Sequence, residues 1–222
     1  MKQLFGIEAL QVLPAQNGFI FVMKQEEREE KAVVTYKLLD FDQLSLTPVT
    51  RNVYLLAKFG NQFERYDDNP DDFLHLRTLL LSDRKLLSVD LKGNATVTLP
   101  DGKAIWRGEL VYNDCPADGL AFGDNRIYVS YPEAGAVLGY NAETMRQEIR
   151  LGGGKDPLPR PEGLYYQNEQ LLICMPTEKM IGQLDLKTFQ LSEYESFDQG
   201  VHRYVKVNAN EVVMLDSGVY KL

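Results

Sequence analysis

The chain has 222 residues, of which 44% are hydrophobic and 25% charged, and its formal net charge is −8. This composition predicts a soluble, globular protein with enough apolar residues for a sizeable core. The negative charge opposes phosphate backbones and anionic lipid, so it argues against nucleic acid and membrane surfaces as partners.

The sequence shows no clear sign of a membrane span, a signal peptide or a disulfide framework. No stretch is long and apolar enough to span a bilayer, and the first residues lack the apolar run of a signal peptide. Two cysteines do not make a disulfide framework, and Cys174 lies in an apolar run typical of a core strand. We therefore expect a cytoplasmic protein, or a periplasmic or secreted one if a signal segment has been removed.

Short apolar or alternating runs follow one another along the chain, and none has a convincing helical period. Such runs, separated by turn residues, predict an all-β fold. In chain order the runs are residues 18–22, 33–36, 53–56, 73–77, 86–90, 95–99, 127–131, 171–175, 204–207, 211–215 and 219–222, with a further outer strand or connection within 102–112.

A turn signal recurs between these runs. It begins at Asp40, Asp90, Asn141 and Asp185, at intervals of 50, 51 and 44 residues. An Asp or Asn at the first position of a turn accepts hydrogen bonds from the backbone N–H groups that follow it. The recurrence predicts a repeated unit that ends in a tight turn between two strands.

A longer sequence motif occurs twice, and the two copies align 44 residues apart without a gap. The first copy begins Asp118-Gly119-Leu120 and the second begins Glu162-Gly163-Leu164, and each continues into a similar strand. A weaker form of the motif begins at Glu8. A repeat of this length, built of short strands and turns, is typical of a β-propeller blade.

Five blades fit the repeats best, although six remain possible. The last repeat has only about three strands, and an open propeller leaves exposed sheet edges. We expect Lys2–Phe5 to pair with Val219–Leu222 and to close the propeller. The sequence thus predicts one β-propeller domain over residues 1–222.

The acidic residue of each motif precedes the innermost strand of its blade. We therefore expect Glu8, Asp118 and Glu162 to converge on the propeller axis. Three neighbouring carboxylates repel one another unless one is protonated or a cation lies among them. Oxygen ligands of this kind favour Ca²⁺ or another hard divalent cation. These residues are the candidate metal ligands, and the alternative is that the acids line a solvated channel while Gly119 and Gly163 serve packing.

These motifs resemble those of the gluconolactonase/regucalcin family and, more loosely, six-bladed repeats of the NHL type. The resemblance implies a propeller with one divalent metal, held at positions that match Glu8, Asp118 and Glu162, and metal-assisted opening of a sugar lactone. The chain departs from the family pattern: Ala9 replaces a Gly, Asp118 an Asn and Glu162 an Asp. It is also shorter than a six-bladed member.

His202 precedes an inner strand of the last repeat, and we regard it as a candidate general base or ligand. Two functions stay open on the sequence alone. The first is a binding module that receives a protein or a small polar ligand at one face or in the axial channel. The alternative is a divalent-metal-dependent hydrolase that resembles gluconolactonase and acts on a sugar lactone, so whether the protein is an enzyme stays open.

Overall fold

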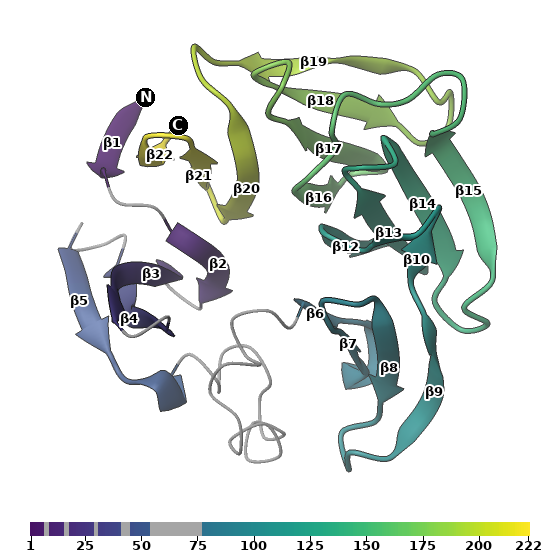
Figure 1. Ribbon diagram of the computed structural model, residues 1–222, viewed down its shortest axis with the longest axis horizontal. Helices are drawn as coiled ribbons and strands as arrows, with labels where there is room; N and C mark the ends of the chain where they lie inside the picture. The colour runs from purple at the N-terminus through teal and green to yellow at the C-terminus, as the bar shows by residue number, and fades with distance from the viewer. Residues whose placement is uncertain (7–8, 16–17, 29–30, 41–44, 54–76) are drawn as a thin grey trace. The chain divides into compact units, whose positions relative to one another are not determined.

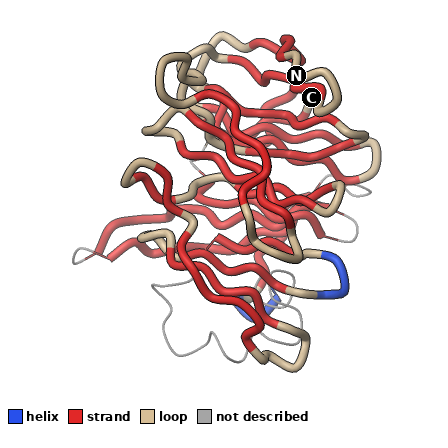
Figure 2. The backbone as a smooth tube through the Cα atoms, turned by 90° about the vertical axis from the view of Figure 1, so that its right-hand side faces the viewer, coloured by secondary structure: helices blue, strands red, loops and turns tan. Residues whose placement is uncertain are grey.

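The computed structural model describes residues 1–6, 9–15, 18–28, 31–40, 45–53 and 77–222. Strands dominate this part of the chain, and helical structure is confined to short turns such as η2 (Ser82–Arg84) (Figure 2). Within the described residues the strands form five four-stranded antiparallel sheets, which are the blades of a five-bladed β-propeller (Figure 1). The predicted fold class is therefore confirmed.

The chain divides into two compact units, Asp71–Arg203 and Met1–Pro70 with Tyr204–Leu222, and the boundary lies within strand β20 (Val201–Val207). The prediction of a single domain over 1–222 stays a prediction. Among the described residues, no helix has the length and apolar character needed to cross a membrane.

Three consecutive blades and one small hairpin make up the unit Asp71–Arg203. Each sheet follows chain order, which is the meander expected of a propeller blade. The strands are β6 (Arg77–Leu80), β7 (Leu86–Val89), β8 (Asn94–Thr98) and β9 (Ala104–Glu109); β10 (Val111–Tyr112) and β11 (Cys115–Pro116); β12 (Leu120–Gly123), β13 (Arg126–Tyr131), β14 (Ala136–Asn141) and β15 (Gln147–Gly152); and β16 (Leu164–Gln167), β17 (Gln170–Met175), β18 (Met180–Asp185) and β19 (Leu191–Ser196).

Burial explains the strand patterns of this unit. The middle strands are covered on both faces, so β13 and β14 are nearly continuous apolar runs. The fourth strand, β9, instead alternates between half-buried and exposed residues, as expected of an outer strand with one face exposed to solvent. The core includes Tyr131 and Tyr140, whose hydroxyl groups are buried and lie 2.9 Å apart in a mutual hydrogen bond.

The predicted turns are present wherever the structure describes them. Backbone N–H groups donate to the side-chain oxygen of Asp90, Asn141 and Asp185, at 2.8–3.0 Å. The turn predicted after Asp40 lies in residues 41–44, outside the described residues.

The unit formed by the two ends of the chain holds the remaining strands. They are β1 (Lys2–Phe5), β2 (Ala9–Ala15), β3 (Gly18–Arg28), β4 (Lys31–Asp40), β5 (Ser45–Val49), β21 (Asn210–Leu215) and β22 (Gly218–Lys221). Strands β2 to β5 form one sheet. The last sheet has the order β1-β22-β21-β20.

The predicted closure by the termini is confirmed. Strand β1 pairs antiparallel with β22, with Lys2 opposite Lys221 and Gln3 opposite Tyr220. Leu4 packs against a core that contains Val219 and Val212. The first strand of the chain therefore supplies the fourth strand of the last sheet.

One expected strand is wrong in part. The sequence predicted an inner strand at Val53–Leu56, but Val53, the one described residue of that range, lies in a helical turn with Arg51 and Asn52. Residues 54–76 lie outside the described residues, and the first strand of this sheet is β6. A short apolar run has no periodicity that distinguishes a strand from a helical turn, which explains the error.

Candidate functional site: a charged cluster on successive repeats

Three candidate residues occupy the same position of three successive repeats. Asp118, Glu162 and His202 each lie six residues before a turn residue, and these turn residues are Asp124, Asn168 and Asn208. All three turn residues have a left-handed φ, of 52°, 48° and 56°. Asp118 precedes β12, Glu162 precedes β16 and His202 lies at the start of β20, all within the unit Asp71–Arg203.

The next residue of each repeat is Gly119, Gly163 and then Arg203. The Arg203 guanidinium lies between the two acids: its Nη2 is 3.0 Å from Asp118 Oδ2, and its Nη1 is 3.7 Å from Glu162 Oε2. Nη1 also donates to the backbone oxygen of His202, at 2.8 Å. The contact at Asp118 Oδ2 is an ion pair without the alignment of a hydrogen bond. One guanidinium thus brings Asp118 and Glu162 into a single network.

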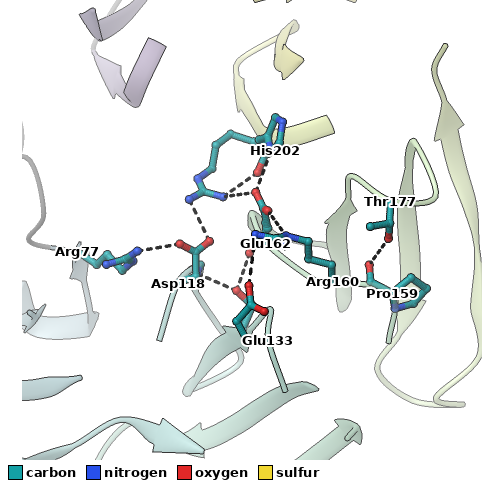
Figure 3. A network of polar contacts seen from close by, with 11 residues as sticks. Arg77, Asp118, Glu133, Pro159, Arg160, Glu162, Thr177 and His202 are labelled. Atoms are coloured by element: carbon teal, nitrogen blue, oxygen red, sulfur yellow. Dashed lines mark hydrogen bonds and ion pairs between the residues drawn. The ribbon is translucent and has the colours of Figure 1, made fainter. Parts of the chain in front are cut away.

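Two more arginines complete the network (Figure 3). Arg77, the first residue of β6, donates from Nη2 to Asp118 Oδ1 at 2.8 Å. Arg160 donates from Nε to Glu162 Oε1 at 3.0 Å, and its Nη2 is 3.3 Å from Glu133 Oε1. We call the seven residues the charged cluster: Arg77, Asp118, Glu133, Arg160, Glu162, His202 and Arg203.

His202 contacts Glu162 directly, because its Nδ1 lies 2.9 Å from Glu162 Oε2. An ionised carboxylate only accepts hydrogen bonds, so Nδ1 carries the proton that it donates to Glu162. Glu162 therefore orients the imidazole and sets which of its nitrogens is protonated.

Backbone hydrogen bonds fix the acids in place. The Ser130 hydroxyl is fully buried; it accepts from Gly119 N–H at 2.7 Å and donates to the Glu162 carbonyl oxygen at 2.6 Å. A Cβ on Gly119 would lie 2.1 Å from that carbonyl oxygen, which explains the glycine. In the next repeat the link is direct, since Gly163 N–H donates to the His202 carbonyl at 3.0 Å. The repeated Gly thus allows consecutive repeats to approach closely, as the sequence suggested.

The acids of the cluster are more buried than its arginines. The side chains of Asp118 and Glu162 are 18% and 13% exposed, whereas those of Arg77 and Arg203 are 26% and 31% exposed. Burial acts to raise the pKa of Asp118, but the guanidinium groups of Arg203 and Arg77 outweigh it and hold the pKa below its ordinary value. Burial likewise opposes ionisation of Glu162, yet hydrogen bonds from His202 and Arg160 lower its pKa. Both acids are therefore ionised at neutral pH.

The predicted metal site is only partly described. Glu8 lies outside the described residues, while the oxygens of Asp118 and Glu162 face arginine or histidine nitrogens. In this arrangement these two carboxylates do not fit a divalent cation, which would have to displace the guanidinium groups. In the described part of the chain no group of three or more His, Cys, Asp or Glu side chains is placed to hold a metal. A cation at Glu8, Asp118 and Glu162 stays a prediction.

Sequence reasoning missed the arginines and Ser130. Arg203 was detectable, because extending the repeat by the turn at Asn208 places it at the glycine position. Arg77 begins a strand in the least regular repeat, and no spacing rule identified it. Ser130 has Cys174 as its counterpart 44 residues later, and burial raises the pKa of that thiol to about 12. Cys174 is thus the core residue predicted.

No protein-family model matches the chain, and no curated protein matches it by sequence. Solved structures with a similar fold include virginiamycin B lyase from Staphylococcus aureus, with a TM-score of 0.57 and 9% identity, covering 100% of this chain and 86% of that one. Glutaminyl cyclase from Myxococcus xanthus gives a TM-score of 0.54 and 9% identity, over 97% and 90% of the two chains. U3-55K gives 0.54 and 14%, over 97% of this chain and 65% of its own length. The kinship with gluconolactonase/regucalcin or NHL repeats stays a prediction, and at these identities the likeness establishes that the chain is a β-propeller by fold.

Proposed function

We propose that this β-propeller is a binding module, and that its ligand binds at the charged cluster. The ligand is a small polar molecule or a polar group of a partner protein. The observation that carries the proposal is that Asp118, Glu162 and His202, from one position of three repeats, meet in a single network through Arg203. The close packing of the repeats rests on the next position, where Gly119 and Gly163 lie.

The energetics of the cluster support a functional origin. Partly buried ion pairs lose much of their Coulombic attraction to desolvation, so an apolar contact of similar volume stabilises a fold equally well. Functional sites are where burial and charged neighbours are arranged so that pKa values shift. Asp118 and Glu162 both have lowered pKa values, and partly exposed Arg77 and Arg203 lie against them.

The two histidines of the chain provide the test. Their imidazole proton resonances are assigned by replacing His75 or His202 with Gln. Five probes are then titrated: succinate, inorganic phosphate, choline, glucose and Ca²⁺. We expect at least one of them to shift the His202 resonance in a saturable way. If none of the five shifts the His202 resonance, the cluster is structural and the proposal fails.

A second candidate function is the sugar-lactone hydrolase that the gluconolactonase resemblance implies. One contact favours it: Glu162 orients the His202 imidazole at 2.9 Å, which is the arrangement of a general base. Hydrolysis of a sugar lactone, followed by proton release with and without Ca²⁺, tests this. Activity that His202→Gln abolishes supports it, and a rate equal to the uncatalysed one excludes it.

A further inference from the structure

We propose that the ligand of the charged cluster is an oxyanion, a carboxylate or phosphate group, and that the guanidinium groups of Arg77 and Arg203 bind it. This inference rests on the proposed function, since it names the chemical class of the ligand for the same cluster. Burial, orientation and a comparison within the chain lead to it.

The charges of the cluster differ in depth, with the acids lying deeper than the arginines. Asp118 and Glu162 are the least exposed side chains of the cluster, and each arginine paired with them is more exposed. Of the other members, His202 is 37% exposed, and the exposed acid Glu133 pairs with Arg160. Among the described residues, a molecule that approaches Arg77 and Arg203 therefore meets guanidinium groups before it meets the carboxylates of Asp118 and Glu162. A cation at that place would face guanidinium groups before it reached a carboxylate.

The second step is that one carboxylate orients two guanidinium groups. Asp118 holds Arg77 through Oδ1 at 2.8 Å and Arg203 through Oδ2 at 3.0 Å. Because a guanidinium is planar and its donors form a rigid fork, the contact of Arg203 Nη2 with Asp118 and the hydrogen bond of its Nη1 to the His202 carbonyl together fix the plane of that guanidinium. Such forks match the oxygens of carboxylates and phosphates, and bonds between two ionised partners are about twice as strong as neutral ones. Two arginines fixed on one acid are a preorganised receptor for an oxyanion.

The third step is a comparison with Arg126, which also contacts two acids. Arg126 is 33% exposed, close to the 31% of Arg203, and it pairs with Asp124 and Glu148. Those acids are 64% and 37% exposed, so they surround Arg126 with negative charge on the solvent side. Arg203 has its acids on the protein side instead. The same ion pairs therefore neutralise Arg126 for a ligand and leave Arg203 presented to one.

The charge of the whole chain limits the size of the oxyanion. A net charge of −8 repels an extended polyanion such as nucleic acid, whereas a short-range contact with one small anion is less affected. The fit is thus to a small acid or a phosphate ester, not to a polymer.

The experiment compares three variants of the full chain by titration calorimetry at constant ionic strength, with succinate, inorganic phosphate and choline as probes. We expect succinate or phosphate to bind the wild type, and Arg203→Gln to weaken that binding about tenfold or more, which is the loss of one charged hydrogen-bonded contact. Arg203→Lys keeps the charge without the fork and should fall between the two. Arg126→Gln, matched in exposure and pairing, should bind as the wild type does. The ratio of succinate to phosphate affinity distinguishes a carboxylate ligand from a phosphate ligand.

The outcomes separate this inference from the proposed function. If choline binds the wild type, Arg203→Gln abolishes that binding, and neither anion binds, the site is real and the oxyanion assignment is wrong. Equal weakening by Arg203→Gln and Arg126→Gln overturns the assignment too, because it reveals general charge screening. If neither succinate nor phosphate binds, the oxyanion assignment fails, and the five-probe titration of His202 still decides the proposed function. Should Arg203→Gln not fold, Arg203→Lys against Arg126→Lys gives the same comparison.

Discussion

The hydroxyl group of Ser130 donates a 2.6 Å hydrogen bond to the carbonyl oxygen of Glu162, and through this contact one repeat holds the acid of the next. The same hydroxyl accepts the N–H of Gly119. Ser130→Ala therefore leaves a buried donor and a buried acceptor without their partner. We expect it to lower the free energy of unfolding by about 2 kcal/mol, measured by urea denaturation.

Ser130→Cys is the matched control for that change. It introduces the residue that the following repeat has at this position, Cys174, and keeps a weak donor and acceptor. A smaller loss of stability than in Ser130→Ala is expected. Equal losses in the two variants would mean that the weak hydrogen bonds of a thiol do not replace those of the hydroxyl.

Gly119→Ala tests the close approach of the repeats. A Cβ there would lie 2.1 Å from the Glu162 carbonyl oxygen and 2.8 Å from Ser130 Oγ, so the backbone must shift. Overpacking of this kind costs about 3 kcal/mol, which thermal or urea unfolding detects. Gly154→Ala is the comparison, because it has open space around it and a φ of +64°, so only the left-handed backbone is strained, at about 1 kcal/mol. A larger loss at Gly154 than at Gly119 would contradict the close packing described for Asp118 and Glu162.

Acid should weaken the charged cluster in a defined pH range. The folded pKa values of Asp118 and Glu162 lie below their ordinary values of 3.8 and 4.5. A carboxyl group whose pKa is lowered by folding stabilises the protein above its unfolded pKa, and this stabilisation disappears as the pH falls through the folded pKa. The free energy of unfolding of the wild type should therefore decline from about pH 4.5 downward, as urea denaturation monitored by Trp106 fluorescence would measure.

The double variant Asp118→Asn with Glu162→Gln should be less stable at neutral pH and have a flatter acid limb. Asp156→Asn, at an exposed position, serves as the control and should follow the wild-type curve. An acid limb of the double variant as steep as that of the wild type would place the responsible carboxylates elsewhere in the chain.

The pairing of β1 with β22 gives a prediction with an internal control. Leu4 packs against the core around Val219 and Val212, whereas Lys2 on the same strand is exposed. Leu4→Asp buries a charge or detaches the strand, so we expect a loss of about 2 kcal/mol and a greater tendency to aggregate through the freed edge of β22. Lys2→Asp introduces the same residue at an exposed position and should leave the melting temperature within about a degree or two. Equal melting temperatures of the two variants would argue that β1 contributes little to the sheet.

The sequence was most informative where a signal is local and repeated. Asp90, Asn141 and Asp185 each close a turn with their own side chains, so each could be predicted without knowing the rest of the fold. The placement of β1 against β22 followed from a global argument, because an unfilled last sheet would expose its edge.

The charged cluster was less predictable, since its contacts join residues far apart in the chain. Asp118 and Glu162 are identified by the repeat, but the repeat cannot show that Arg77, 41 residues before Asp118, contacts it. Arg203 breaks the glycine pattern, and a single break does not indicate which partner the new side chain finds. The expectation of a cation rested on the charge of the acids and on the family resemblance, and it did not include Arg203, which lies between Asp118 and Glu162.

The order in which the strands are made has a consequence for how the last sheet forms. During synthesis β1 emerges first, while β22, its hydrogen-bonding partner, emerges after all the other strands of the described sheets. Leu4 of β1 therefore lacks its packing partners until β21 and β22 have been synthesised. Assembly of this sheet therefore depends on pairing two strands far apart in the chain, and such non-local pairing is slow and leaves apolar residues open to aggregation in the meantime.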